Sequence, residues 1–512
     1  SIVFKANTIL TTNGANAVQA DSGATIIFDK GLVSENSAYI FAHGNNSSIK
    51  INNEGSGLVK IIGNLYAQAG GTLDFKMDNS ESYLEGFTDG VNMDMQNGAT
   101  WRVTGNSSSK NLNLENATVD LTADGASSTV LAVADYSGTG GSFIMDTDLA
   151  SEADGDKINI TTANAGTTYV QVKDASLVNG IEVTGNKNLL LITDASENIN
   201  FVGKNLNAGG LWDVTPTIEN GLTVTDADGN VIGTADQWYL TKIAKAVNND
   251  SQVLLDAVDN SYALWRNTND SLRKRLGELR FRTNETDGDG IWARYTSGKF
   301  SGSGFDSSYN MYQLGYDKAD NAKSTYGFAV DSGTGHANYA SGGGKDKLTA
   351  LSVYGTWTGE KGNYTDVVAR VGQFDTDVDS YGDYPDKASY KNRAYSLSVE
   401  YGKRIELSKE RGTFIEPQAQ LIIGRLGSNS YITDRGTAVA VEGMNSAIAR
   451  LGVVAGKKIN DGSDIYFKVS ALHEFAGERD ISMRAANGEV LAGSNDYGDT
   501  WFELGLGGNV KL

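Results

Sequence analysis

Polar and apolar residues alternate along most of the second half of the chain. The segment 415–421 reads Ile-Glu-Pro-Gln-Ala-Gln-Leu, so that every second residue is apolar. Successive side chains of a β-strand point to opposite faces of its sheet, which gives this strand one apolar and one polar face. Many such strands, apolar outside and polar inside, are typical of a transmembrane β-barrel.

The alternation predicts ten strands in this half. They span residues 290–299, 308–318, 324–340, 346–360, 362–379, 389–407, 411–428, 437–459, 463–479 and 499–512, with longer connections at 379–389 and 479–499. The residues predicted to face the lumen include Trp292, Arg294, Gln313, Asp366, Arg370, Glu400, Glu416, Arg450, Lys468, Glu474 and Glu503. Those predicted to face lipid include Leu351, Val353, Leu397, Val399, Ile423, Leu451, Val453, Phe467, Val469, Phe502, Leu504 and Leu506.

A helical pattern precedes these strands and predicts a helix over about 251–281. Apolar residues recur at helical spacing from Leu254 to Leu279, and Asp250-Ser251 can cap its start. Thirty residues in a helix reach about 45 Å, which is enough to thread a membrane. Charged residues near its end forbid contact with lipid, so we expect the helix to lie inside the wet lumen. These are Arg273, Lys274, Arg275, Glu278 and Arg280.

The first part of the chain contains short β-rich runs separated by Asn/Gly turns. The runs are 24–28, 48–51, 59–62, 72–75 and 117–121. Short strands at close spacing favour a parallel β-helix in which each rung stacks on the last. A β-sandwich is the rival interpretation, but the scarcity of Pro and the repeated Gly-x-Thr openings favour the solenoid.

Aromatic residues become more frequent in the stretch that precedes the helix. A solenoid end exposes unpaired strand edges and must be capped. We therefore interpret residues 131–241 as the last rungs and a cap, in which Trp212 and Trp238 pack against the end of the solenoid.

Composition narrows the possible functions. The 512 residues include no Cys, three Pro and 61 Gly, and the net charge is −20. Without Cys, thiolate metal sites, thiol catalysis and disulfides are excluded. The acidic excess argues against nucleic acid as a partner, because proteins neutralise phosphates with Lys and Arg. No secretion signal is recognisable at Ser1, although an outer-membrane protein needs one, so we expect the natural chain to extend upstream.

Eight segments of the second half carry motif-like sequences: 274–280, 290–294, 312–317, 354–357, 414–421, 443–446, 450–452 and 472–477. In this order and together, they resemble the translocator barrel of type V autotransporters of the AIDA/pertactin-like kind. The resemblance is strong over 251–512, weaker over 130–240 and only general before that. Barrels of this family have twelve strands and typically end in an aromatic residue. This chain gives ten and ends in Leu512, so we expect the last barrel strands to be missing.

The resemblance implies an all-β fold with four parts. These are the C-terminal part of a right-handed passenger β-helix (1–130), an autochaperone or cap region (131–241), a linker and pore-spanning helix (242–281), and a transmembrane β-barrel (282–512). It also implies outer-membrane lipid, the barrel assembly machinery and periplasmic chaperones as partners, and a passenger at the cell surface. The host or neighbouring-cell ligand is unknown.

Little in the sequence points to catalysis, a metal or a cofactor. Some autotransporters cut themselves at an Asn of the barrel helix, and the corresponding region here is Asn267, Asn269, Asp270 and Ser271. The paired Asn of the self-cleaving members is replaced by Asp270-Ser271, which favours an ordinary polar helix face. Residues 226–230 start like a calcium loop, but Gln237 stands where its bidentate Glu is needed, which favours a turn.

Three functions remain open at this point. The passenger could be an adhesin or self-association factor, since regular solenoids offer long polar faces. It could instead belong to an enzyme, such as a protease, whose catalytic domain lies upstream of Ser1. A plain porin is a third interpretation, which the helix and the attached β-helix disfavour.

Overall fold

The computed structural model describes residues 1–125, 128–269, 272, 276, 279, 289–460 and 463–509. The chain divides into two compact units. The first comprises residues 1–208 and 212–246, and the second comprises residues 209–211 and 247–512. Each unit is described by itself.

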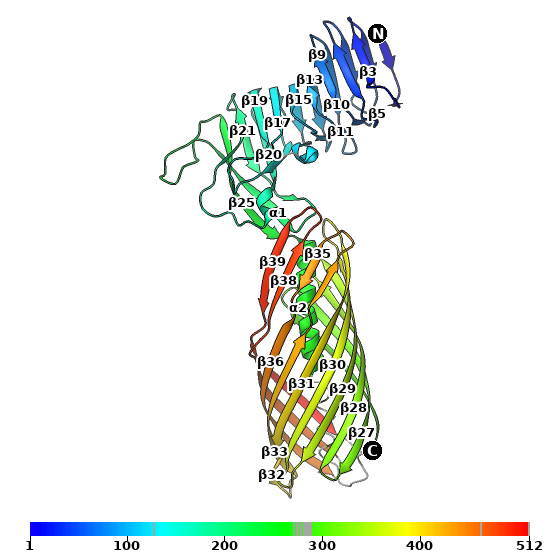
Figure 1. Ribbon diagram of the computed structural model, residues 1–512, viewed down its shortest axis with the longest axis vertical. Coiled ribbons are helices and arrows are strands. Elements are labelled where there is room, and N and C mark those ends of the chain that lie inside the picture. Colours follow the sequence, from blue (N-terminus) through cyan, green and yellow to red (C-terminus); the bar gives the residue numbers. More distant parts are fainter. Residues whose placement is uncertain are drawn as a thin grey trace. The chain divides into compact units, whose positions relative to one another are not determined.

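The first unit consists of three sheets whose strands stack rung upon rung (Figure 1). The first sheet has the order β1 (Ile2–Phe4), β4 (Thr25–Phe28), β7 (Ser48–Ile51), β10 (Thr72–Met77), β13 (Val91–Gln96), β15 (Ser107–Glu115), β17 (Val130–Ser137), β19 (Lys157–Ala163), β21 (Leu189–Asp194), β25 (Gln237–Val247), β24 (Trp212–Asn220) and β23 (Leu206–Asn207). The second sheet has the order β2 (Thr8–Ile9), β5 (Leu32–Ser34), β8 (Lys60–Ile62), β11 (Tyr83–Glu85), β14 (Thr100–Arg102), β16 (Thr118–Asp120), β18 (Ser142–Thr147), β20 (Gly166–Asp174) and β22 (Ile199–Gly203). The third sheet has the order β12 (Thr88–Asp89), β9 (Leu65–Gln68), β6 (Tyr39–His43) and β3 (Asn16–Asp21).

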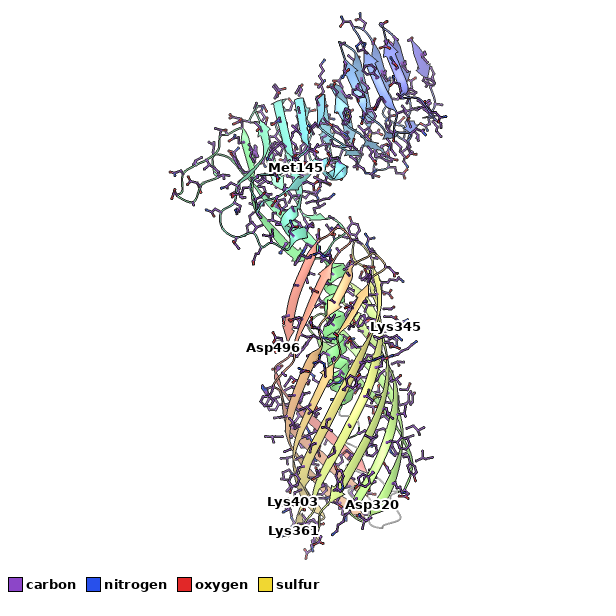
Figure 2. All side chains as sticks on the ribbon, in the orientation of Figure 1. Met145, Asp320, Lys345, Lys361, Lys403 and Asp496 are labelled. Carbon is purple, nitrogen blue, oxygen red and sulfur yellow. The ribbon has the colours of Figure 1, made fainter. Side chains whose placement is uncertain are left out.

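Stacked apolar side chains fill the inside of this parallel β-helix. Ile49 of β7 pairs with Leu73 of β10, and both side chains are fully buried. Lys50, the next residue of β7, points outward. Met145, labelled in Figure 2, is one of the fully buried residues farther along the stack. Gly31 allows two neighbouring rungs to approach closely. Any side chain at this position would place its Cβ only 2.0 Å from the carbonyl oxygen of Leu58. The solenoid interpretation is thus confirmed and the β-sandwich is wrong.

The parallel stacking ends in antiparallel strands. β21 pairs antiparallel with β25, and β23 pairs antiparallel with β24. These strands lie beyond the last parallel pairs and cover the end of the core, where Trp238 packs edge-on against Phe201 with ring centroids 5.4 Å apart. Two short helices, η1 (Leu121–Asp124) and α1 (Ala175–Asn179), interrupt the rungs before this point.

The second unit is built on one antiparallel sheet that curls around a helix (Figure 1). This curled sheet has the order β26 (Gly290–Gly302), β27 (Phe305–Asn321), β28 (Ser324–Tyr339), β29 (Gly342–Thr358), β30 (Asn363–Ser380), β31 (Lys387–Lys403), β33 (Thr413–Leu426), β36 (Met444–Asn460), β37 (Ser463–Glu474) and β40 (Thr500–Asn509), with β32 (Ile405–Ser408) paired to β33. Short turns with exposed charges join strands at one end, where Figure 2 labels Asp320, Lys361 and Lys403.

The predicted strands are present, but several predicted boundaries are wrong. The segment 389–407 breaks at Arg404, between β31 and β32. The segment 437–459 is not one strand, because β35 (Ala438–Val441) ends before Glu442-Gly443 and β36 starts after them. The segment 463–479 divides at Gly477, whose φ of 126° lets the chain leave the direction of β37. The predicted connection 479–499 is largely a hairpin of β38 (Glu478–Arg484) and β39 (Val490–Asp496). Together with β34 (Asn429–Ile432), these strands form a small sheet of order β34-β35-β38-β39.

The outer surface of the curled sheet is apolar. All twelve residues predicted to face lipid are exposed, and Phe502, Leu504 and Leu506 of β40 reach 72%, 72% and 87% exposure. Such exposure of large apolar side chains is incompatible with contact with water over a whole surface and fits a lipid environment.

A long helix, α2 (Asn249–Asn269), runs inside the curl (Figure 1). The predicted cap is wrong, because Asn248 is the capping residue and its Oδ1 accepts a hydrogen bond of 2.9 Å from the backbone N–H of Ser251. Asp250 instead accepts hydrogen bonds from the backbone N–H groups of Gly382 and Tyr384. Of the predicted continuation to residue 281, the structure describes Leu272, Leu276 and Leu279, which are buried.

In the part of the chain that the structure describes, no helix has both the length and the apolar character needed to cross a membrane.

Candidate functional site

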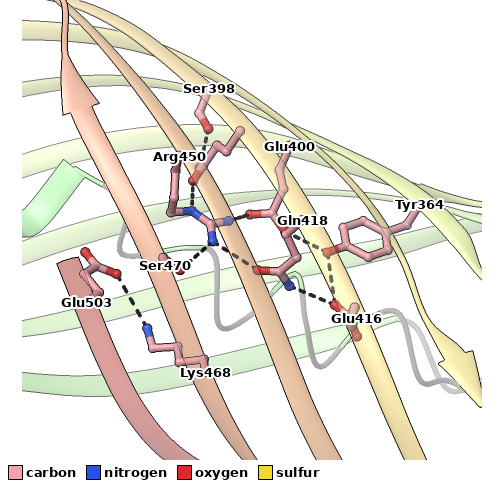
Figure 3. Close-up of polar contacts among 10 residues, drawn as sticks. Tyr364, Ser398, Glu400, Glu416, Gln418, Arg450, Lys468, Ser470 and Glu503 are labelled. Carbon is pink, nitrogen blue, oxygen red and sulfur yellow. Dashed lines mark hydrogen bonds and ion pairs between the residues drawn. The ribbon is translucent and has the colours of Figure 1, made fainter. Parts of the chain in front are cut away.

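The interior of the curled sheet holds buried polar side chains at the inward positions of its strands. Arg450 of β36 and Glu400 of β31 are 1% and 2% exposed, and they form an ion pair with Nη2 and Oε2 2.5 Å apart (Figure 3). Arg450 Nε also donates to Gln420 at 2.7 Å, and its Nη1 donates to Gln418 at 3.1 Å and to Ser470 at 3.2 Å. The guanidinium therefore links four strands of the wall, β31, β33, β36 and β37.

Tyr364 joins this network to Glu416. Its hydroxyl lies 2.9 Å from Oε1 of Glu400 and 3.0 Å from Oε1 of Glu416, and Gln418 donates to the same Glu416 oxygen at 2.9 Å (Figure 3). Glu416 is 4% exposed. Farther along the wall, Lys468 Nζ lies 3.9 Å from Glu503 Oε2. Each buried charge of this wall is thus provided with partners, as burial in a low-dielectric interior requires.

A second pair connects the wall to the end of α2. Arg370 Nη2 lies 2.8 Å from Asp331 Oδ2, and Gln313 donates to Asp331 Oδ1 at 3.0 Å. Arg370 Nη1 also donates to the backbone carbonyl of Thr268 in the last turn of α2. A buried guanidinium needs hydrogen-bond acceptors, and this carbonyl supplies one beside the Asp331 carboxylate.

Carboxylates hold the other turns of α2. Asp346 accepts from Asn260 at 3.2 Å, and Asp259 of the helix accepts from Asn495 at 2.6 Å and from Tyr497 at 2.5 Å. Glu474 accepts from Tyr262 at 3.3 Å, from Ser446 at 2.5 Å and from the Ala447 N–H at 2.6 Å.

Hydroxyl and backbone donors of the sheet and of Tyr262 therefore surround the Glu474 carboxylate. Arg273, Lys274, Arg275, Glu278 and Arg280 lie outside the described residues.

Aromatic rings fill the space between these polar contacts. Tyr262 stacks on Tyr497 with centroids 4.1 Å apart, and Trp265 belongs to a buried cluster with Met311, Phe374 and Ile422. Deeper in the curl, Trp292 donates from Nε1 to the Tyr354 hydroxyl at 2.8 Å, and Leu272, Leu276 and Leu279 pack beside these two rings. The guanidinium of Arg294, which is half-buried, lies 5.9 Å from the Trp292 ring centroid. Among the described residues, α2 and these rings therefore occupy the interior of the curled sheet.

The predicted self-cleavage region lies at the end of α2. Asn267 donates from Nδ2 to the Ala263 carbonyl one turn earlier at 2.8 Å, and Asn269 accepts from Ser396 of β31 at 2.5 Å. Asp270 and Ser271 lie outside the described residues. Both Asn side chains therefore make the contacts of a helix that is held against a polar wall.

The predicted cap aromatics lie at the end of the β-helix. Trp212 and Trp238 both pack against its core, and Lys245 Nζ lies 4.6 Å above the Trp212 ring. Asp226 forms a local turn, in which Oδ1 accepts from the N–H groups of Asp228 and Asn230 at 2.9 and 2.8 Å. These hydrogen bonds from Asn230 are the main reason why the pKa of Asp226 is lowered.

Sequence reasoning missed several residues that hold the helix. Asn495 and Tyr497 both donate to Asp259 of α2, which precedes them by more than 230 positions. Nearby in the sequence, Arg479 is 2% exposed and donates to the Glu442 carbonyl. Asn495, Tyr497 and Arg479 lie in or at the edge of what was predicted as a connection. An alternating Asp-Ile-Ser-Met pattern at 480–483 was the available signal for the hairpin.

Comparison with known proteins agrees with this arrangement. The Autotransporter beta-domain family matches residues 287–512, and the Pertactin family matches residues 109–241. The chain is 27% identical over 438 residues to the BrkA autotransporter of Bordetella pertussis, which covers 81% of this chain and 40% of that protein. It is 32% identical over 267 residues to the pertactin autotransporter of Bordetella parapertussis, and the alignment covers 48% of this chain and 27% of that protein. It is 26% identical over 437 residues to the serine protease pet autotransporter of Escherichia coli, and the alignment covers 81% of this chain and 32% of that protein. The chain thus spans less than half the length of these relatives.

An apolar-coated curled sheet with a helix inside follows a parallel β-helix, in agreement with the match to an autotransporter β-domain behind a pertactin-like region. Together with the two family matches and these relatives, this arrangement supports a type V autotransporter. Its second unit is the β-domain of the outer membrane, and its first unit is passenger at the cell surface.

Proposed function

We propose that this chain exports its own β-helical passenger through the β-domain and then anchors it at the cell surface, where the passenger acts as an adhesin or self-association factor. The observation that carries the proposal is the course of the chain, which leaves the β-helix and passes directly into α2 inside the curled sheet. A segment that has been pulled through the pore and has stopped there has this course. The contacts of α2 with Arg370, Asp346 and Glu474 retain it as an anchor.

We further propose four functional parts with bounds at 1–130, 131–241, 242–281 and 282–512. In this division, the region 131–241 nucleates folding of the β-helix outside the cell, and the free energy of that folding helps to draw the chain outward. Insertion of the β-domain engages the barrel assembly machinery, and periplasmic chaperones keep the passenger unfolded before export. The chain itself is proposed to be non-enzymatic, without metal or cofactor.

The adhesin assignment is tested by display of the full chain on a non-adherent bacterium. Cells that display the chain are expected to settle from suspension or bind host-cell monolayers more than cells that display only residues 247–512. Equal adhesion by both strains, at equal surface levels of the β-domain, would contradict the assignment.

An alternative is that the β-helix belongs to an enzymatic passenger, since one relative is named a serine protease. The gene sequence upstream of Ser1 discriminates between the two. A globular domain with a Ser/His/Asp set supports the enzyme, and further rungs support the adhesin.

A further inference from the structure

The third sheet of the β-helix carries aromatic rings on its outer face. Along β6, Ile40 and Ala42 point into the core and are fully buried, whereas Tyr39, Phe41 and His43 point outward. Tyr66 of β9 pairs in register with Phe41, and Phe87 lies on the next rung, just before β12. Tyr39 is 39% exposed, and Phe41, Tyr66 and Phe87 are partly exposed. A parallel β-helix gains nothing in its core from these rings.

The four rings form one patch around Tyr66. The Tyr66 ring is nearly perpendicular to those of Tyr39, Phe41 and Phe87, with centroid distances of 5.5, 5.7 and 5.4 Å. Neighbouring rungs of a parallel stack are about 4.8 Å apart, so a patch over three rungs extends about 10 Å along the solenoid. Hydrophobic side chains on a surface of this kind mark a binding face more often than chance exposure does.

A row of hydrogen-bonding side chains runs beside the aromatic patch. His43 Nδ1 lies 3.6 Å from Asp21 Oδ1, and Gln68 donates to Asp89 Oδ2 at 2.6 Å. Ser108 donates to the other oxygen of Asp89 at 3.0 Å. His43 and Gln68 are two positions beyond Phe41 and Tyr66 on the same strands, which places the two rows about 7 Å apart. The hydrogen bonds of Gln68 and Ser108 to Asp89 hold these three side chains in place in the absence of a ligand.

An apolar shelf beside fixed amide and carboxylate groups matches the chemistry of a sugar chain. A sugar ring presents C–H groups on its faces and hydroxyl groups at its rim. Aromatic rings pack against the C–H groups, and Gln, Asp and His side chains form hydrogen bonds with the hydroxyl groups. The nearby carboxylates Asp21 and Asp89 and the net charge of −20 disfavour an anionic chain. A protein partner typically covers about 20–30 residues a side, far more than this patch offers.

We propose that the outer face of the third sheet binds a short stretch of a neutral polysaccharide, with Tyr66 as the central contact. The inference rests on the proposed exposure of the passenger at the cell surface, and it specifies the ligand class of the proposed adhesin. Sugar units stack on Tyr66 and its three neighbouring rings, and Gln68 and Asp89 bind their hydroxyl groups.

The test uses the full chain purified in detergent and a panel of immobilised neutral glucans, galactans and mannans, together with heparin and alginate as anionic probes. At least one neutral polysaccharide is expected to bind. Tyr66→Ala is expected to weaken that binding tenfold or more, and Gln68→Ala is expected to weaken it several-fold. Tyr169→Ala is the matched control, because Tyr169 is a partly exposed ring on the second sheet and its loss is expected to leave binding unchanged.

Folding of each variant is checked by far-UV circular dichroism and by resistance of the β-helix to trypsin, and Phe41→Tyr serves as a conservative variant with binding retained. The proposal is overturned if no neutral polysaccharide binds, if only the anionic probes bind, or if folded Tyr66→Ala binds like the parent chain. Cells that display the passenger but fail to bind sugar would contradict this inference alone, whereas a passenger absent from the surface would contradict the proposed function.

Discussion

Single buried charges in the β-domain depend on their partners. Arg450 and Glu400 are almost fully buried and pair with each other, so removal of one leaves the other charge in a low-dielectric interior. Breaking such a pair costs about 3–5 kcal/mol, whereas removal of both charges is often close to neutral.

Arg450→Met is therefore expected to lower the thermal stability of the β-domain markedly, and Arg450→Met combined with Glu400→Gln is expected to recover most of the loss. The measurement is the temperature at which the folded form in detergent changes its mobility on an SDS gel. A double variant as unstable as Arg450→Met alone would contradict the assigned coupling.

In the passenger, the carboxyl groups of Asp146 and Asp156 interact, although no sequence pattern predicts this pair. Asp156 accepts from the backbone N–H groups of Thr129 at 2.8 Å and Asp146 at 2.7 Å, and its side chain is fully buried. Burial, followed by the neighbouring Asp156 charge, raises the pKa of Asp146 from 3.8 to about 7. Burial raises the pKa of Asp156 from 3.8 to about 6, against the opposing effect of its backbone donors.

These raised values predict that the β-helix is most stable in mild acid. Between about pH 4 and pH 7 the folded chain holds protons that the unfolded chain has released, so the free energy of unfolding falls as the pH rises through this window. The limiting slope is about 1.4 kcal/mol per pH unit for each such proton. Urea unfolding of the passenger in the full chain, followed by pulse proteolysis, is expected to show a higher midpoint at pH 5 than at pH 8.

Asp146→Asn is expected to flatten this pH dependence, and Asp228→Asn, at an exposed turn, is expected to leave it intact. A midpoint that rises with pH in the parent chain would show that the carboxyl groups are ionised in the folded state.

At the scale of elements, α2 is expected to limit the conductance of the β-domain. Its Tyr262 and Trp265 rings occupy the interior against Tyr497, Met311 and Phe374. Replacing both Tyr262 and Trp265 by Ala removes ring volume that the rigid sheet cannot recover. The double variant is expected to raise single-channel conductance in planar bilayers several-fold over the parent chain. Leu351→Ala, on the lipid face, is the control and is expected to conduct like the parent chain.

The antiparallel strands β23–β25 cover the last rung of the β-helix, and an uncovered rung exposes unpaired backbone groups. Deletion of residues 206–246 is therefore expected to leave the β-domain inserted but the passenger misfolded and sensitive to trypsin. Replacement of the exposed turn 226–230 by a Gly-Ser linker, which keeps β24 and β25, is expected to preserve trypsin resistance. A protease-resistant passenger after the deletion would contradict the capping role.

Elements with a strong periodic pattern of apolar residues were predictable from the sequence. Elements and boundaries that depend on tertiary contacts were not. Strands such as β33 were visible because every second residue is apolar, and the parallel rungs were visible from their short runs and turns. The helix start was placed two residues late, because Asn248 and Asp250 are equally good capping residues and only contacts with Gly382 and Tyr384 distinguish them. The hairpin β38–β39 was missed because Arg479 and Asp480 give it the composition of a loop, although Arg479 is buried.

The interior site was predictable by face but not by partner. Alternation placed Arg450, Glu400 and Glu416 on the inward side, yet their pairing depends on strand register, which the sequence alone does not fix. Glu474 illustrates the difference, since it accepts hydrogen bonds from Tyr262, Ser446 and a backbone N–H, and alternation predicts none of these partners.

At the scale of the whole molecule, the chain passes from the surface-exposed solenoid into α2 and then into the membrane-embedded β-domain. The most direct test is protease shaving of intact cells that express the full-length gene, followed by blots with antibodies against each unit. External protease is expected to remove the residues before about 247 and to leave a protected β-domain fragment, since the strands of the curled sheet are shielded by lipid. If the first unit is protected until the outer membrane is permeabilised, it is periplasmic, and both the topology and the export function proposed here are wrong.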